Sequence, residues 1–278
     1  MKIIIPMAGT GNRFVQQGYA DPKPLIRING KRIIEYILDM FDDDDEFVFI
    51  CNDVHLETTD MRNILLSLKP NATIVSMPQH KLGPVYTVQA VYDHIGDDEE
   101  VIVSYCDNPH LWDRADFERV MHSNNFDGCV LTHTGFHPHT LASTKMAFVK
   151  GKDGILEEIK EKACYTDDPM SEHASTGVYY FRKGAYIKKY FDELIKRNIN
   201  YNGEFYVTLV YNLLVEDGLR VGYYDTPFVT VFGTPDEVRN FEAWASILFG
   251  GQVKTREDLI KCCDYWEQYH ASNLRRHR

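Results

Sequence analysis

Short apolar runs alternate with helical patterns over the first half of the chain. Residues 2–6 predict a buried strand, which leads into a glycine-containing loop and then a helix over residues 32–41. The alternation continues with strands predicted over 46–51, 72–77, 100–105 and 127–134, and helices over 61–68, 85–94 and 116–124. This order is typical of βαβ units. We therefore expect an α/β fold with a doubly wound, mostly parallel sheet.

The pattern changes in the second half. Strands are predicted over 145–149, 175–182, 221–224 and 228–232, and helices over 185–197 and 205–216. Gly233-Thr234-Pro235-Asp236 then predicts the start of a last helical region, with Thr234 or Asp236 as its N-cap. We expect one main domain over residues 1–236 and a C-terminal helical extension over 237–278.

Composition and charge narrow the class of protein. The 278 residues are 44% apolar and carry a formal charge of −11, so the chain is globular and lacks the excess of positive charge of a general nucleic-acid binder. A nucleotide site needs only a few cations and backbone amides. The six cysteines form no CxxC pair, the N-terminal apolar run is too short for a signal peptide, and no segment has the apolar length of a membrane span. We therefore expect reduced thiols, a cytoplasmic location and no membrane partner.

The loop after the first strand carries the strongest chemical signal. Gly9 and Gly11 let backbone N–H groups approach an anion, while Arg13 and Lys23 supply positive charge. A dinucleotide-binding loop would need a third glycine where Phe14 stands, and a Walker A loop would need Gly-Lys-Ser/Thr. A purely structural turn would leave Arg13 and the spacing to Pro22-Lys23-Pro24 unexplained. The loop therefore predicts a phosphate site.

Two further segments predict contacts with a nucleotide and a metal. Gln79 lies between a strand and a helix, where its amide can hydrogen-bond the edge of a base, and Gly83 would let a ring lie close to the backbone. An ordinary polar loop is the alternative. Asp107 follows the strand over 100–105, which is where α/β proteins bind ligands and where a carboxylate suits Mg²⁺. An aspartate capping a turn is the alternative there.

Gly9-x-Gly11-x-Arg13 followed by Pro22-Lys23-Pro24 resembles the signature of the nucleotidyltransferases that make activated sugars. The resemblance covers about residues 1–240 and is strongest to the small members found in capsule and surface-polysaccharide gene clusters. It implies a Rossmann-like, GT-A-type nucleotidyltransferase fold. It also implies a Mg²⁺-dependent reaction between a nucleoside triphosphate, with a pyrimidine base (CTP, UTP or dTTP) favoured, and a phosphorylated sugar or polyol, which releases pyrophosphate.

The resemblance also implies roles for individual residues. Those implied for nucleotide binding are Ala8, Gly9, Thr10, Gly11, Gln79 and Gly83. Those implied for catalysis are Arg13, Lys23 and Asp107, of which Asp107 is also the metal ligand. Those implied for acceptor binding are Glu161, Lys162, Thr176, Gly177, His137 and His139. Ala163 departs from the family, which has a proline after the lysine. For the two histidines, substrate hydrogen bonding, a surface loop and a metal site all stay open.

One departure concerns the metal, because many family members carry a second metal-binding aspartate just before the late Gly-Thr. Here Val231 and Phe232 precede Gly233-Thr234, so either Asp107 suffices with phosphates and water or another carboxylate replaces the missing one. The alternatives are Asp225, Glu204 and Asp236.

Two other functions compete with the nucleotidyltransferase. A GT-A glycosyltransferase would usually carry an Asp-x-Asp motif, whereas Asp107 is followed by Asn108 and Pro109. A regulatory nucleotide-binding subunit would be expected to lose Arg13 and Lys23. The apolar stretch over 241–249 makes a homodimer plausible.

Overall fold

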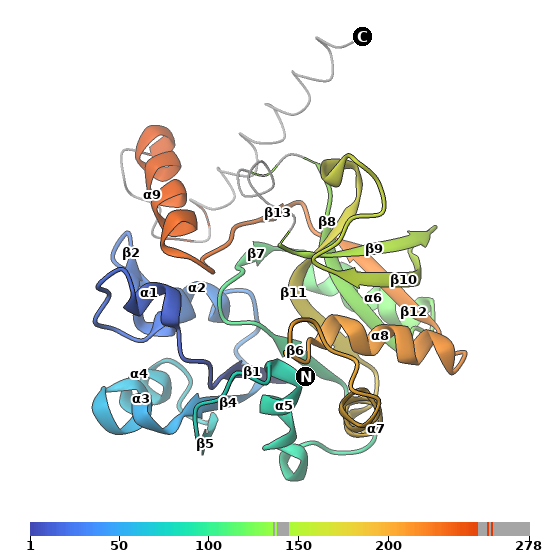
Figure 1. Ribbon diagram of the computed structural model, residues 1–278, viewed down its shortest axis with the longest axis horizontal. Coiled ribbons are helices and arrows are strands. Elements are labelled where there is room, and N and C mark those ends of the chain that lie inside the picture. The colour runs from blue at the N-terminus through green and yellow to red at the C-terminus, as the bar shows by residue number, and fades with distance from the viewer. Residues whose placement is uncertain (136, 138–144, 250–254, 256, 258–278) are drawn as a thin grey trace.

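The computed structural model describes residues 1–135, 137, 145–249, 255 and 257. Its centre is a nine-stranded sheet with the order β5-β4-β1-β6-β11-β8-β12-β10-β9, and helices cover both faces (Figure 1). The strands of this sheet are β1 (Lys2–Met7), β4 (Glu46–Asn52), β5 (Thr73–Met77), β6 (Val101–Ser104), β8 (Gly128–His133), β9 (Ala147–Lys152), β10 (Ile155–Glu161), β11 (His173–Phe181) and β12 (Val221–Asp225). Two small ribbons pair β2 (Arg27–Ile28) with β3 (Lys31–Arg32) and β7 (His110–Leu111) with β13 (Phe228–Val229).

The helices follow the strands closely along the chain. The α-helices are α1 (Asn12–Val15), α2 (Ile33–Leu38), α3 (Asp53–Thr58), α4 (Met61–Leu68), α5 (Pro84–Gln89), α6 (Arg114–Ser123), α7 (Gly184–Lys196), α8 (Val207–Glu216) and α9 (Pro235–Phe249). Short 3₁₀ turns are η1 (Lys23–Leu25), η2 (Tyr92–His94) and η4 (Pro169–Ser171). In the part of the chain that the structure describes, no helix is long and apolar enough to cross a membrane.

The first strands form the parallel, doubly wound part of the sheet that the sequence predicts. β1 lies between β4 and β6 in parallel register, with Lys2 opposite both Glu46 and Val101. Beyond β6 the sheet is mixed, because β11 and β10 are each antiparallel to both of their neighbours. The α/β fold class is therefore confirmed. The antiparallel β11 brings its own residues next to the carboxyl end of β6.

Successive side chains of the central strands pack alternately into two separate hydrophobic cores. Ile4 and Val103 face α5, α7 and α8, whereas Ile3, Ile5 and Ile102 face α2, α4 and α6. All five side chains are fully buried. This alternation explains why β1 and β6 appear in the sequence as continuous apolar runs: both faces of each strand are covered by helices.

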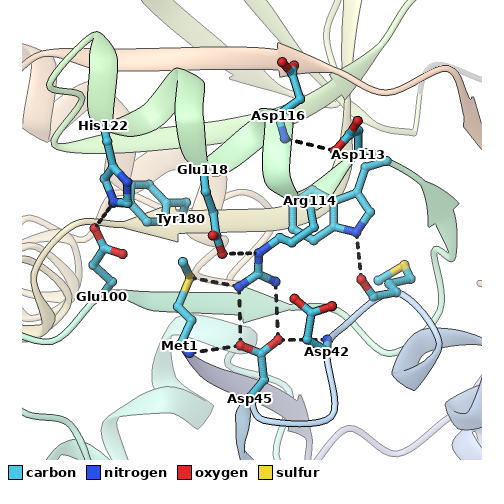
Figure 2. Close-up of polar contacts among 12 residues, drawn as sticks. Met1, Asp42, Asp45, Glu100, Asp113, Arg114, Asp116, Glu118, His122 and Tyr180 are labelled. Carbon is cyan, nitrogen blue, oxygen red and sulfur yellow. Dashed lines mark hydrogen bonds and ion pairs between the residues drawn. The ribbon is translucent and has the colours of Figure 1, made fainter.

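An ion-pair network fixes the amino ends of β1 and β4, opposite the edge where both strands end. Arg114 of α6 contacts both Asp45 and Glu118, with its Nη2 lying 3.3 Å from Asp45 Oδ1 and its Nε 2.7 Å from Glu118 Oε1 (Figure 2). The amino group of Met1 lies 3.0 Å from Asp45 Oδ1. Asp45 is nearly buried and shares its charge with two cations, so this end of the sheet is held by polar contacts as well as by apolar packing.

Helix α9 packs on α1 and α2. Val238, Phe241 and Ala245 of α9 belong to one apolar cluster with Phe14 and Tyr36. Figure 1 shows α9 beside β2 and α2 and far from α7 and α8. The boundary expected at residue 236 falls inside the first turn of α9.

β10 is not among the strands that the sequence pattern predicted. Its buried residues are Leu156, Ile159 and Glu161, and the pairing with β9 shifts register between Leu156 and Glu158. A bulge breaks the alternation of buried and exposed positions, so the strand appears polar in sequence. β10 matters for function because it ends at Glu161 and Lys162.

Candidate active site in two adjoining cavities

Two cavities adjoin at the carboxyl ends of β1 and β6. We call the first, of about 340 Å³, the loop cavity, because it is walled by the loop after β1, by η1 and by the segment before α5. We call the second, of about 470 Å³, the β10 cavity, because the end of β10 forms one side of it. Tyr105, Asp107, Glu204 and Tyr206 line both cavities. Two ligands bound in the two cavities would therefore meet at Asp107.

The loop cavity gathers most of the residues expected around a nucleotide. Those that line it are Ala8, Gly9, Thr10, Gly11, Lys23, Gly83 and Asp107. Gly11 has φ +61° at the start of α1, a conformation that glycine adopts without strain. A Cβ built on Gly9 would meet no atom within 4 Å, so a ligand can approach this part of the backbone closely.

Lys23 and Asp107 form an ion pair at the junction of the cavities. Lys23 begins η1 between the buried prolines Pro22 and Pro24, and its Nζ contacts Asp107 Oδ2. Burial by itself would lower the pKa of Lys23. Attraction to Asp107, helped by Cys106 and Glu237, outweighs burial and raises that pKa, so the ammonium stays charged.

The structure does not place Gln79 where the predicted contact with the base would be. Gln79 is exposed and does not line either cavity, whereas His80 and Lys81 line the loop cavity. The Leu82 backbone N–H donates to His80 Nδ1 (3.1 Å), so the neutral ring carries its proton on Nε2, 3.0 Å from Thr87 Oγ1. Burial lowers the pKa of His80. Residue types alone do not favour His80 over Gln79, since consecutive loop residues point in different directions.

At Gly83 the wall of the loop cavity packs against the backbone of Phe205, next to the wall of the β10 cavity. Its φ is +90°, and a Cβ built there would lie 2.7 Å from both N and O of Phe205. The Phe205 N–H donates to Leu82 O (2.8 Å), and the Val85 N–H donates to Phe205 O (3.1 Å). Glycine is therefore required here for contact with the Phe205 backbone, whose neighbours Glu204 and Tyr206 line both cavities.

The end of β10 brings a charged group to the β10 cavity. Lys162 has φ +56°, and its Nζ donates to Tyr206 OH (2.5 Å), which donates to Glu204 Oε2 (2.6 Å). Glu161 is buried and accepts a hydrogen bond from Thr208 Oγ1 (2.6 Å). Burial raises the pKa of Glu161, while Thr208 and Lys162 oppose that rise. Glu161, Lys162 and the exposed Arg13 all line this cavity.

β11 contributes Gly177 but not the side chain of Thr176. The pairing of β11 with β8 shifts register between Ser175 and Tyr179, and Gly177 has φ +86°. Gly177 lines the β10 cavity, where a Cβ would lie 2.9 Å from Asn108 Nδ2. Thr176 is fully buried, and its Oγ1 donates to Leu131 O (3.3 Å). The Thr176 side chain therefore does not make the expected contact with the acceptor. Adjacent strand residues face opposite sides, so Thr176 points away from the cavity that Gly177 lines.

The two histidines expected near the acceptor have different outcomes. His137 is 5% exposed, with its ring 4.4 Å from that of His133, and it does not line either cavity. The structure thus places it away from the expected acceptor contact. His139 lies outside the described residues.

The carboxylates considered as replacements for the missing metal ligand are only partly at the site. Asp225 pairs with His173, and Asp236 pairs with Arg239, both away from the cavities. Glu204 lines both cavities but accepts the hydrogen bond from Tyr206. Glu237, which the sequence did not single out, lines the β10 cavity beside Asp107.

The oxygen atoms at the junction fit a hard cation. Among the described residues, no group of three or more His, Cys, Asp or Glu side chains could hold a metal. Mg²⁺ does not need such a group, because it is usually held by one or two carboxylates together with phosphates and water. The buried Glu237 Oε2 has no hydrogen-bond partner among the described residues, which suits an additional ligand near Asp107.

Cys106 lies beside Asp107 and lines the loop cavity. Burial raises the pKa of its thiol to about 11, which Lys23 opposes, so the thiol is protonated at neutral pH and is a poor nucleophile. Cys51, Cys129 and Cys164 are also free thiols.

Comparisons with known proteins find a matching family model and longer relatives. A family model described as the MobA-like NTP transferase domain matches residues 3–161, which is more than half of the chain. The bifunctional protein GlmU of Staphylococcus epidermidis strain RP62A is 25% identical over 247 residues, covering 86% of this chain and 51% of that protein. The chain thus spans about half the length of the curated relatives it matches.

Solved structures share the fold. The nucleoside-diphosphate-sugar pyrophosphorylase of Vibrio cholerae RC9 superposes with a TM-score of 0.68 at 22% identity, covering 86% of this chain and 98% of that one. The inositol-1-phosphate CTP transferase of T. maritima superposes with a TM-score of 0.66 at 17% identity, covering 90% and 96%.

Proposed function

The chain belongs to the MobA-like NTP transferase domain family, and we propose that it joins a nucleoside triphosphate to a phosphorylated sugar or polyol and releases pyrophosphate. The nucleotide would occupy the loop cavity, and the acceptor would occupy the β10 cavity. The observation that carries the proposal is the junction of the two cavities at Asp107, because two bound ligands would touch there. A binding protein for one ligand would not need the second cavity.

The distribution of charge supports a reaction between two anions. Lys23 lies in the loop cavity, and Arg13, Lys145 and Lys162 line the β10 cavity. Positive groups on both sides of the junction would hold the triphosphate and the acceptor phosphate against their mutual repulsion. Much of the rate would come from this positioning.

The chemistry we propose is direct displacement at the α-phosphorus. An oxygen of the acceptor phosphate forms a bond to the α-phosphorus while the bond from that phosphorus to the bridging oxygen breaks, and pyrophosphate leaves with the bond's electron pair. The attacking oxygen is already anionic, so no general base is required. The proposed displacement uses no covalent enzyme intermediate, and the protonated Cys106 thiol is a poor nucleophile for forming one.

Mg²⁺ would be held by Asp107 with phosphate oxygens, and when bound it would neutralise charge that builds up on the leaving pyrophosphate. Lys23 would donate hydrogen bonds to the phosphates once it is released from Asp107. The Lys162 ammonium would contact the acceptor phosphate, and its hydrogen bond to Tyr206 limits its movement. The Gly9–Gly11 backbone would donate N–H groups to the triphosphate.

The choice of substrates is proposed more broadly. His80, Lys81 and Gly83 form the side of the loop cavity where a base would lie, and a pyrimidine (CTP, UTP or dTTP) is the base we favour. The tyrosines and Lys162 of the β10 cavity suit a phosphorylated, hydroxylated acceptor. The resemblance to capsule-cluster enzymes supports a surface-polysaccharide precursor as the product and a cytoplasmic location.

Pyrophosphate release tests the proposal. The full chain is incubated with Mg²⁺, each of CTP, UTP, dTTP, ATP and GTP, and a panel of phosphorylated sugars and polyols. We expect release with at least one pair and its loss in Asp107→Asn. Asp44→Asn is the control, because Asp44 is an exposed carboxylate outside both cavities. If no pair reacts and no triphosphate binds, the proposed function is wrong.

A further inference from the structure

Glu237 lies in the first turn of α9 and points toward Asp107. The chain reaches this position because β13 pairs with β7, and the Phe232 N–H then donates to the Asp107 carbonyl oxygen (2.7 Å). Gly233 follows, and α9 begins two residues later. The backbone of Asp107 therefore fixes where α9 starts and where its first turn faces.

The Glu237 and Asp107 carboxylates converge on one point above Gly233. A Cβ built on Gly233 would lie 3.1 Å from Glu237 Oε2 and 3.4 Å from Asp107 Oδ2. The two oxygens are thus no farther apart than those two distances combined. Glycine at position 233 leaves open the space that a side chain would otherwise take between them.

One oxygen of the Glu237 carboxylate lacks a hydrogen-bond partner among the described residues. This oxygen, Oε2, is buried. Burial raises the pKa of Glu237 and the charge of Asp107 raises it further, while Thr234, Lys145 and Lys23 oppose the rise. Such an arrangement destabilises the free protein unless a cation completes it, because burying an unpaired carboxylate oxygen is unfavourable.

A capping role does not account for this geometry. Thr234 and Glu237 have the Thr-x-x-Glu spacing of a capping box, and the Glu237 N–H donates to Thr234 Oγ1 (3.3 Å). A complete capping box would also turn the glutamate toward the backbone N–H of Thr234. Instead Oε2 faces Asp107 and the cavity, and no other described residue donates a hydrogen bond to it.

We propose that Glu237 is the second protein carboxylate of the divalent-metal site, acting with Asp107 and the phosphates of the nucleotide. This inference rests on the proposed function and names a ligand on α9. Two carboxylates and phosphate oxygens form a donor group that Mg²⁺ and Mn²⁺ prefer. In the free protein the Lys23 ammonium supplies the positive charge beside Asp107, so Lys23 and the metal compete for that carboxylate.

Mn²⁺ binding to the full chain tests the inference without any turnover. Free Mn²⁺ is measured by electron paramagnetic resonance while protein is added, in the absence of nucleotide. We expect one saturable site, with affinity at least tenfold weaker in Glu237→Gln and in Asp107→Asn. Asp236→Asn is the matched control on the same helix turn, because Asp236 pairs with Arg239 outside the cavities, and it should bind as the wild type does.

Lys23→Met tests the effect of the Lys23 ammonium on metal binding at Asp107. Removal of the ammonium frees Asp107, so Mn²⁺ should bind this variant more tightly than the wild type even though turnover is lost. Wild-type Mn²⁺ affinity in Glu237→Gln would overturn the inference, as would the absence of a saturable site in the wild-type protein. Either result leaves the proposed function standing if pyrophosphate is still released, so the two failures are distinguishable.

Thermal unfolding in EDTA distinguishes a ligand from a structural residue. Glu237→Gln should unfold at or above the wild-type temperature, since an amide relieves the repulsion from Asp107. Added Mn²⁺ should raise the unfolding temperature of the wild type and not that of the variant. A lower unfolding temperature for the variant in EDTA, with the same Mn²⁺ response as the wild type, would mean that Glu237 only caps α9.

Discussion

Gly9→Ala should separate nucleotide binding from folding. Gly9 is exposed in the wall of the loop cavity, its φ lies outside the left-handed region, and an added Cβ would meet no atom within 4 Å. The free protein should therefore lose no stability. It should gain about 0.4–1 kcal/mol, because alanine restricts the unfolded chain more than glycine does.

The same methyl group should obstruct the triphosphate. A phosphate oxygen bound by a backbone N–H lies about 2.9 Å from the nitrogen, whereas a methyl carbon needs about 3.5 Å. The phosphate would have to move away and lose one charge-assisted hydrogen bond, which contributes about 1.5–3 kcal/mol. We therefore expect the Kd for the triphosphate to rise roughly ten- to a hundredfold.

Calorimetric titration of the triphosphate that supports pyrophosphate release measures this change, and denaturant unfolding measures stability. Gly218→Ala is the converse control: Gly218 has φ +76° and lies outside the cavities, so alanine there should cost about 1 kcal/mol of stability without changing nucleotide affinity. Wild-type nucleotide affinity in Gly9→Ala would refute the reasoning that this loop holds the phosphates.

Three further substitutions probe other parts of the site. Gly83→Ala should lower the free energy of unfolding by about 2–4 kcal/mol and raise KM for both substrates, because the alanine Cβ would overlap the Phe205 backbone. Unchanged values in unfolding and steady-state assays would contradict this. Lys162→Met should raise KM for the acceptor roughly tenfold or more while leaving KM for the nucleotide unchanged, and equal effects on both would argue against separate cavities. Burial lowers the pKa of His110 to about 4. Below pH 6.5 the unfolded state therefore binds more protons, and this residue should make the protein about 1 kcal/mol less stable at pH 5.5 than at pH 7.5 in urea unfolding, a difference that should disappear in His110→Gln.

The parts of the site that the sequence predicted depend on a rule that holds for parallel α/β sheets in general. A parallel strand ends at the same edge as its neighbours, so the loop after β1 and Asp107 after β6 had to lie close together. Lys23 was predicted from its positive charge and from the spacing of Pro22-Lys23-Pro24 after the glycine loop. These residues do meet around the loop cavity.

The residues whose positions were wrongly predicted or missed depend on the direction in which a side chain points, or on a contact between distant segments of the chain. His80 rather than Gln79 faces the loop cavity, and Thr176 faces β8 rather than the acceptor side. Neither orientation can be obtained from residue type, since a shift of one position reverses the side of a strand. Glu237 was missed because its position depends on β13 pairing with β7, a contact between segments more than a hundred residues apart.

The charges of the molecule explain why the metal would belong at the junction. The chain carries −11 overall, yet both proposed substrates are anions. At physiological salt, charges beyond about 8 Å are largely screened, so the cations in the cavities decide binding. Those cations flank the junction, while Asp107, Glu204 and Glu237 lie at or near it. Two phosphates would meet carboxylates there and repel them. A divalent cation at that point converts the carboxylates from a barrier into ligands, so substrate affinity should depend on the metal more than on ionic strength.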